Sequence, residues 1–304
     1  MSYETQVLDA LSAAGVRPPG MLLWFGRRAE AAQLVDALRQ RLLADFYEPG
    51  AARPRSAASA GGPGDGGELA RALSQANCGR GSWQAGWRVA DAGGDTITVV
   101  RPDGLRLLAP PQDCRGDEVR VPKECKALSP GCYVALGDTP AAGGERVRLS
   151  WNIAAAGAVT LVARVTYVLN GAGLPFSLEL PDSPARYERR DAAALLLART
   201  DFAAAVKLLR PLLRALGPHL ADGAPAFSKP LARGLAIAEE PAGAERFGEH
   251  RCRLLAEAIV TAGERGLRSA AERLAVVREG FAAAGITLEA PYLQPGSDDA
   301  YELS

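Results

Sequence analysis

A chain of 304 residues can bury the core of one large domain, with or without a smaller appendage. Its 35 basic residues balance its 35 acidic residues, so the formal net charge at pH 7 is zero. This balance disfavours nucleic acid as a partner, because phosphate backbones are bound through an excess of basic side chains. No apolar run approaches the ~18 residues of a membrane span, and the N-terminus lacks the pattern of a signal peptide. We therefore expect a cytoplasmic protein that binds no membrane.

The five cysteines are an odd number and include no C-x-x-C pair, which argues against a disulfide framework and against a zinc site. We expect reduced thiols and no bound metal. The basic side chains are almost all arginine. Any lysine base or histidine acid must come from the remaining residues, Lys123, Lys126, Lys207, Lys229, His219 and His250.

In the first third of the chain, apolar periodicity predicts helices over residues 3–14 and 28–46. Residues 49–67 are mostly Ala, Gly, Pro, Ser and Arg, a composition that buries too little apolar surface to order itself, and we expect a flexible loop. Short β-like runs between residues 87 and 108, separated by turn residues, predict a small antiparallel sheet. We assign residues 1–110 to this N-terminal helical and small β region.

The remaining residues, 111–304, are expected to form an α+β core. The sharpest strand is 146–153, in which apolar residues alternate with Arg148, Ser150 and Asn152, so one face belongs to the core and the other is a polar ladder. Further strands are predicted over 176–180, 192–198 and, as strand or loop, 234–240; helices are predicted over 156–170, 201–216, 248–265 and 269–284. This order favours mixed helices packed on a small, largely antiparallel sheet.

The segment Phe247–Arg253 places His250 beside two arginines, Arg251 and Arg253, at a predicted helix start. Free backbone N–H groups and the helix dipole favour an anion there. Arg251 lies on the apolar stripe of this helix, so it should be buried and needs a partner rich in acceptors. Two alternatives remain open: His250 as a hydrogen-bonding residue without proton transfer, and Arg251 as a structural clamp. Arg253 stands four residues before Glu257 and is typical of a surface ion pair.

The order of several segments resembles the HopA-type effector family, which includes bacterial type III effectors and the stand-alone lyase subunits of class V lanthipeptide and thioamitide dehydratases. The segments that carry the resemblance are Val121-Pro122-Lys123-Glu124, Leu128-Ser129-Pro130-Gly131-Cys132-Tyr133, Arg148 with Trp151-Asn152, Leu174-Pro175-Phe176, Tyr187-Glu188-Arg189-Arg190-Asp191, Leu231 to Glu240, Phe247 to Arg253, and Pro291-Tyr292-Leu293-Gln294-Pro295-Gly296. The resemblance implies a HopA-like fold. Its lyase members eliminate phosphate from phosphoserine or phosphothreonine in a precursor peptide, which gives dehydroalanine or dehydrobutyrine.

The resemblance also implies two partners: a precursor peptide, with its leader and core, and an aminoglycoside-phosphotransferase-like kinase that installs the phosphate. No cofactor is implied. The sequence departs from the family pattern at Glu179, where a lysine is expected.

Elimination needs a base for the Cα proton, cationic groups for the leaving phosphate and an acid for the bridging oxygen. We assign the phosphate to Arg148, Arg189 and Arg251, because guanidinium forks match phosphate oxygens and the three come from separate motifs. Arg189 has a structural alternative, a clamp on Asp191. His250 is the candidate acid. The further candidates are Lys123 as base with Lys229 second, and Asn152 and Arg253 as substrate-binding residues.

These assignments make a phosphoserine/phosphothreonine lyase, a carbon–oxygen lyase, the first hypothesis for the function. Glu179 favours the rival slightly, a non-catalytic phosphopeptide-binding partner of the kinase. A type III effector that acts on a host protein is the third hypothesis.

Overall fold

The computed structural model describes residues 2–17, 21–24, 27–30, 34–49, 65–93, 95–125 and 131–303. Most of the predicted loop over 49–67 lies outside the described residues. Its last three residues, 65–67, are helical, because they form the first turn of α3 (Asp65–Ala76). Residues 128–130 of the sequence resemblance also lie outside the described residues.

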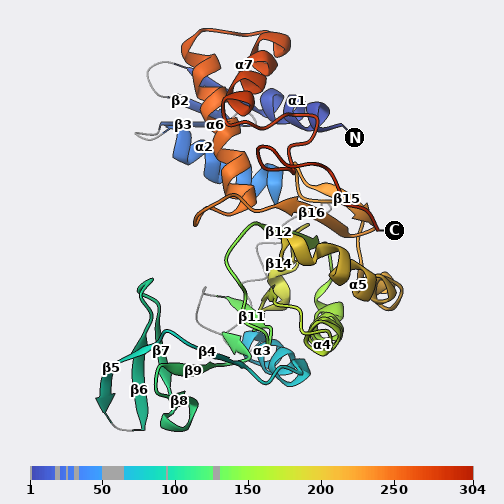
Figure 1. The fold of residues 1–304 in the computed structure, drawn as a ribbon. Helices are drawn as coiled ribbons and strands as arrows, with labels where there is room; N and C mark the ends of the chain where they lie inside the picture. Colours follow the sequence, from blue (N-terminus) through green and yellow to red (C-terminus); the bar gives the residue numbers. More distant parts are fainter. Residues whose placement is uncertain are drawn as a thin grey trace.

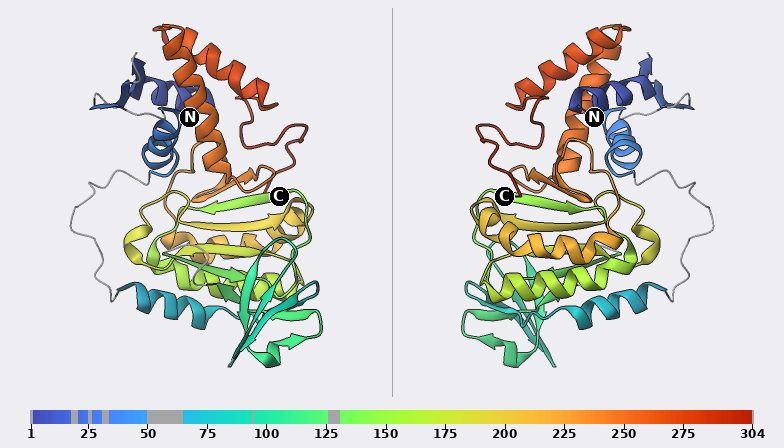
Figure 2. Two further views of the ribbon diagram at one scale, coloured as in Figure 1. Left: turned by 90° about the vertical axis from the view of Figure 1, so that its left-hand side faces the viewer. Right: turned by 90° about the vertical axis from the view of Figure 1, so that its right-hand side faces the viewer.

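A seven-stranded, entirely antiparallel sheet forms the centre of the molecule (Figures 1 and 2). Its strands, in spatial order, are β10 (Glu124–Cys125), β11 (Cys132–Leu136), β13 (Ser177–Pro181), β14 (Ala193–Ala198), β12 (Arg146–Trp151), β16 (Leu235–Glu239) and β15 (Lys229–Ala232). The predicted strands at 146–153, 176–180, 192–198 and 234–240 are therefore confirmed, as is the α+β fold class. Strands β10, β11 and β15 were not predicted.

Two helices, α4 (Ala155–Gly171) and α5 (Phe202–Leu216), cover one face of this sheet (Figure 1). The apolar residues of β12, Val147, Leu149 and Trp151, are fully buried in the main core. The opposite side of β12 differs from the prediction. Arg148, Ser150 and Asn152 are also buried, because β12 is a central strand and the chain after β16 returns over this face.

A second group of helices packs beyond the β15–β16 edge of the sheet (Figure 2). It comprises α1 (Tyr3–Ala13), α2 (Leu34–Leu42), a π-helical turn (Leu43–Tyr47), α6 (Phe247–Glu264) and α7 (Ala270–Ala283). Helix α2 packs on α6, and α1 packs on α7. The predicted helix over 28–46 begins at Leu34, where leucines start to recur every four positions, at Leu34, Leu38 and Leu42. Residues before it form a small antiparallel sheet of β1 (Ala14–Arg17), β2 (Met21–Trp24) and β3 (Arg27–Glu30).

A small β region lies at the far end of the molecule, beside α3 (Figure 1). The predicted antiparallel sheet is confirmed as β5 (Arg88–Gly93), β6 (Thr96–Val100) and β7 (Arg106–Ala109). A second sheet joins β4 (Ser82–Gln84), β9 (Glu118–Val121) and β8 (Cys114–Arg115). Because β4 pairs with β9, the predicted division between residues 110 and 111 separates strands that belong together.

Short 3-10 helices complete the described structure at Pro111–Asp113, Pro184–Arg186, Arg199–Asp201 and Gly217–His219. All five cysteines are free thiols. Within the described ranges, no helix combines the length and the apolar character needed to cross a membrane.

Candidate functional site

The first turn of α6 is already occupied by carboxylates of the protein. The N–H of Phe247 donates to Glu240 at 2.9 Å, and the N–H of the N-cap residue Arg246 donates to Glu249 at 3.1 Å. These bonds satisfy two of the free donors that open a helix. The N–H groups at this helix start, where the sequence predicted an anion, thus bind two carboxylates of the protein itself, those of Glu240 and Glu249.

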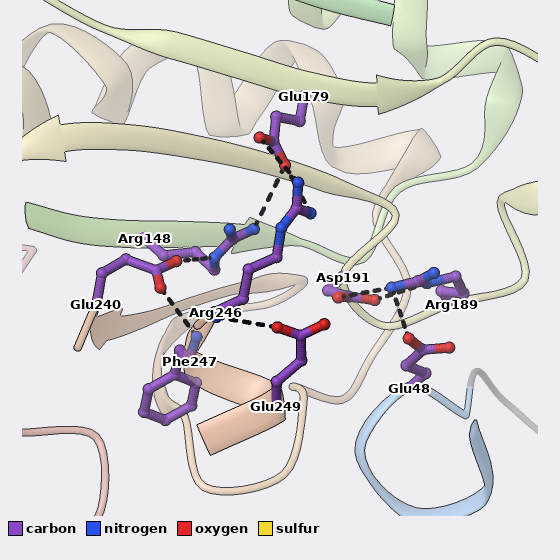
Figure 3. Close-up of polar contacts among 9 residues, drawn as sticks. All are labelled: Glu48, Arg148, Glu179, Arg189, Asp191, Glu240, Arg246, Phe247 and Glu249. Carbon is purple, nitrogen blue, oxygen red and sulfur yellow. Dashed lines mark hydrogen bonds and ion pairs between the residues drawn. The ribbon is translucent and has the colours of Figure 1, made fainter. Parts of the chain in front are cut away.

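Glu240 also binds the buried guanidinium of Arg148 through Nε (Figure 3). Both side chains are almost fully buried, so each needs the other to avoid an uncompensated charge. Burial is the largest single influence and acts to lower the pKa of Arg148, but the interactions with Glu240, Tyr47 and Glu179 together outweigh it, and the pKa lies above its usual value. Arg148 is therefore a permanent cation on the covered face of the sheet.

Glu179 lies between two guanidinium groups from different elements (Figure 3). Its carboxylate is 3.1 Å from Nη1 of Arg246 and 4.0 Å from Nη1 of Arg148. The Arg246 side chain is 53% exposed and that of Glu179 is 23% exposed, so this end of the site reaches solvent. We refer to Arg148, Glu179, Glu240 and Arg246 as the α6 cluster.

Arg189 forms a second charged group beside the α6 cluster (Figure 3). Its Nε and Nη2 both donate to Asp191 at 3.0 Å, and Nη2 is 2.9 Å from Glu48. Burial acts to lower the pKa of Arg189, but the charge of Asp191, the hydrogen bonds to it and the charge of Glu48, with a contribution from Tyr47, together raise the pKa above its usual value. The clamp on Asp191, the structural alternative for Arg189, is confirmed; a role in phosphate binding stays a prediction.

Tyr47 packs on α6 close to these charged groups. It was not among the residues predicted from the sequence. Its ring packs against the ring of Phe247, with 6.3 Å between centroids, and lies over the backbone of Gly248. A Cβ added to Gly248 would stand 2.6 Å from Cζ of Tyr47, so this position requires glycine. Nothing in the local pattern around Tyr47 distinguishes it from an ordinary core tyrosine.

Arg251 is fully buried, as its place on the apolar stripe predicted. It donates to the carbonyl oxygens of Pro291 and Leu293, each at 2.7 Å, and its guanidinium lies 4.9 Å from the centroid of the Phe247 ring. Burial lowers its pKa to about 10. These contacts are those of a structural clamp, the alternative left open by the sequence, and they hold the C-terminal segment.

Nδ1 of His250 lies 2.7 Å from Nη1 of Arg251, within hydrogen-bonding distance. Because arginine is a donor only, Nδ1 accepts and the neutral ring carries its proton on Nε2. Burial, and then the charge of Arg251, lowers the pKa of His250 to about 4. At neutral pH the ring is uncharged, which weakens the case for an acid; the catalytic role stays a prediction.

The two candidate lysine bases make contacts elsewhere. Nζ of Lys123 donates to the carbonyls of Ser74 and Asn77 at 3.0 and 2.8 Å, at the C-terminal end of α3. Nζ of Lys229 lies 2.7 Å from a carboxylate oxygen of Asp299. Each lysine thus has a structural task in this conformation.

The two remaining candidates also have partners outside the α6 cluster. Asn152 donates through Nδ2 to the carbonyl of Asp222 at 2.9 Å, so it fixes a loop at the end of β12. Arg253 pairs with Glu245 and Glu257, each at 3.0 Å, which confirms the surface ion pair predicted for Glu257. For Asn152 and Arg253, substrate binding stays a prediction.

Sequence reasoning also missed Glu240 and Arg246. Glu240 follows the apolar run that forms β16, and a carboxylate next to a buried strand could have been marked as needing a cation. No local signal indicates that this cation is Arg148, 92 residues away in the chain.

Comparisons with known proteins agree with this architecture. The model of the HopA1 effector protein family matches residues 124–293, which is more than half of the chain. The chain therefore belongs to the HopA1 effector protein family. A search of curated proteins found no significant match.

Two solved structures are similar to this chain. One is the effector protein from Pseudomonas syringae pv. tomato strain DC3000, with a TM-score of 0.56, 17% sequence identity and 96% of each chain covered. The other is the effector protein from Pseudomonas syringae pv. syringae strain 61, with a TM-score of 0.49, 16% identity, and coverage of 86% of this chain and 96% of that one. At this identity, the likeness to the first shows a shared fold.

Proposed function

We propose that this chain is the phosphoserine/phosphothreonine lyase subunit of a peptide dehydratase. In this proposal, a separate aminoglycoside-phosphotransferase-like kinase phosphorylates a lanthipeptide or thioamitide precursor, and this chain eliminates the phosphate to leave dehydroalanine or dehydrobutyrine. The observation that supports a phosphate site is the Glu179 carboxylate, which lies between the guanidiniums of Arg148 and Arg246. One anion is held there between two cations.

A phosphate monoester suits the same surroundings. Guanidinium groups bind phosphate oxygens through paired N–H donors, and Arg148 and Arg246 approach from a strand and from a helix cap. The exposed Arg246 can turn from Glu179 to a ligand at small cost, because exposed ion pairs contribute only ~0.2–1 kcal/mol. Neutralising the leaving phosphate is the part of the elimination that these arginines would perform. The base, Lys123 or Lys229, stays a prediction.

A second candidate function is phosphopeptide binding without elimination. Two observations favour it: Glu179 stands where the family resemblance implies a lysine, and both candidate bases are hydrogen-bonded away from the α6 cluster. Such a subunit would present the phosphorylated precursor to the kinase or hold it for another enzyme.

Mass spectrometry of a phosphoserine peptide, ideally the cognate precursor, distinguishes the two functions. The peptide is incubated with the full chain, with and without the kinase. We expect loss of phosphoric acid with the wild-type protein and with Arg265→Gln, an equally exposed arginine at the other end of α6 that pairs with Glu279, and no loss with Arg246→Gln. Binding of the cognate phosphopeptide without any mass loss would establish the second function. Neither binding nor loss would overturn both.

A further inference from the structure

Tyr47 is the last residue of a π-helical turn, Leu43–Tyr47, that follows directly on α2. π-Helical turns are rare and are frequently found at functional sites. Here the turn directs the ring of Tyr47 onto the first turn of α6, against Phe247 and over Gly248. The side chain is almost completely buried, with 3% of the residue exposed.

The charged groups of the site surround this ring. The next residue, Glu48, pairs with Arg189, while Glu240 binds both Arg148 and the N–H of Phe247. The Phe247 ring, which packs on Tyr47, also lies against the guanidinium of Arg251. The three arginines that come from separate sequence motifs, Arg148, Arg189 and Arg251, therefore gather around the Tyr47–Phe247 pair.

The Tyr47 hydroxyl makes no hydrogen bond with any described residue. The hydroxyl is not one of the fully enclosed polar atoms that lack a partner, so the tip of this otherwise buried side chain is open to an acceptor on a ligand. Arg148 is the cation that acts on it, beside the carboxylates of Asp191 and Glu240. Burial, and then the charge of Asp191, raises the pKa of Tyr47 well above its usual value. The phenol therefore stays protonated, as a donor that cannot serve as a base.

We propose that the Tyr47 hydroxyl donates a hydrogen bond to a non-bridging phosphoryl oxygen of the peptide phosphate bound at Arg148. This inference rests on the proposed phosphate site and adds a contact to it; the hydroxyl transfers no proton. The acceptor is an oxygen that carries negative charge, because the phosphate would take the place of the Glu179 carboxylate beside Arg148 and Arg246. Tyr47 makes the inner end of the site selective for a phosphorylated over an unmodified side chain.

The test compares binding of a phosphoserine peptide and of its unmodified form by calorimetry, using the full chain. Tyr47→Phe removes only the hydroxyl. We expect its dissociation constant for the phosphopeptide to rise roughly tenfold or more, as for the loss of a hydrogen bond to a charged group, with unchanged thermal melting. The matched control is Tyr187→Phe, whose hydroxyl donates to the carbonyl of Pro181 at 2.9 Å, and which should bind the phosphopeptide as the wild type does.

A second measurement guards against a folding effect: the phosphorus-31 shift of the bound phosphopeptide should change in Tyr47→Phe and not in Tyr187→Phe. Unchanged affinity and an unchanged shift in Tyr47→Phe would overturn the inference. If Arg246→Gln abolishes binding while Tyr47→Phe does not affect it, the phosphate site stands and the role of Tyr47 falls. If Tyr47→Phe weakens binding but the wild type eliminates nothing, the contact stands and the lyase falls.

Discussion

The guanidinium of Arg251 is bonded to the imidazole of the preceding residue, His250, with 2.7 Å between Nη1 and Nδ1. Two side chains that the sequence marks for chemistry are thus bound to each other. The other N–H groups of Arg251 donate to Pro291 and Leu293, so the pair links the first turn of α6 to the C-terminal segment. This relationship should make the stability of the fold sensitive to replacement of either residue.

Replacement of Arg251 by alanine should destabilise the fold by about 3–5 kcal/mol, because it leaves two buried carbonyls without donors and opens a cavity beside Phe247. Chemical denaturation measures the change. Arg253→Ala, two residues along the helix with exposed partners, should cost about 0.5 kcal/mol or less. Equal effects of the two variants would show that the Arg251 bonds contribute nothing specific.

Stability should fall on acidification between about pH 6.5 and pH 4 through His250. Its pKa in the folded chain, about 4, lies below that of an unfolded histidine, so in this window the unfolded chain binds the extra proton. The loss should be about 1–2 kcal/mol, allowing for the partial exposure of the ring. His250→Asn keeps an acceptor for Arg251 but does not titrate. Its stability, followed by denaturation across this range, should decline less with pH than that of the wild type.

Glu179→Gln should increase the affinity for a phosphoserine peptide about five- to tenfold. The change keeps the shape of the side chain and removes the negative charge that competes with phosphate for Arg148 and Arg246. Calorimetry at fixed ionic strength measures it. Glu279→Gln removes a carboxylate that pairs instead with Arg265, at the other end of α6, and serves as the control. Weaker phosphopeptide binding by Glu179→Gln would show that Glu179 supports the site and does not compete for it.

Gly248→Ala should destabilise the chain by about 1–3 kcal/mol, because the new methyl group would meet the Tyr47 ring at 2.5–2.6 Å. Gly280→Ala in α7 is the matched helical substitution. Its new Cβ would meet only ordinary contact, at 3.7 Å from Ala258, so it should stabilise the chain by about 0.5–1 kcal/mol. Thermal or chemical unfolding of both variants checks the pair. A stabilising Gly248→Ala would contradict the tight approach of Tyr47 to α6.

Local patterns in the sequence were sufficient for much of the fold. The alternation in β12 and the apolar stripe of α6 are set by neighbours a few residues apart, and both elements lie where they were predicted. Burial of Arg251 followed from its position on that stripe. Strand β15 contains Pro230 and lies at the edge of the sheet formed by the described residues, paired with β16, so its local sequence carried no strand signal.

The candidate site was harder to predict, because its contacts join distant segments. The bond between Arg148 and Glu240 and the packing of Tyr47 on Gly248 depend on sheet order and on where α2 docks. Neither contact can be predicted from the spacing of residues along the chain. The pair of Arg189 with Asp191, two residues along the chain, was therefore foreseen, whereas the distant carboxylates Glu240 and Glu48 were not.

The docking of α2 against α6 has a practical consequence for how this protein is cut. The family match begins at residue 124, yet Leu38 and Leu42 are fully buried in the same core as α6, and Tyr3 packs on Tyr292. A fragment trimmed to the matched residues would expose that apolar surface to water and lose Tyr47. The segment that the family model matches is thus shorter than the segment that must fold together. Chimaeras between relatives should therefore exchange the N-terminal helices α1 and α2 together with the C-terminal helices α6 and α7.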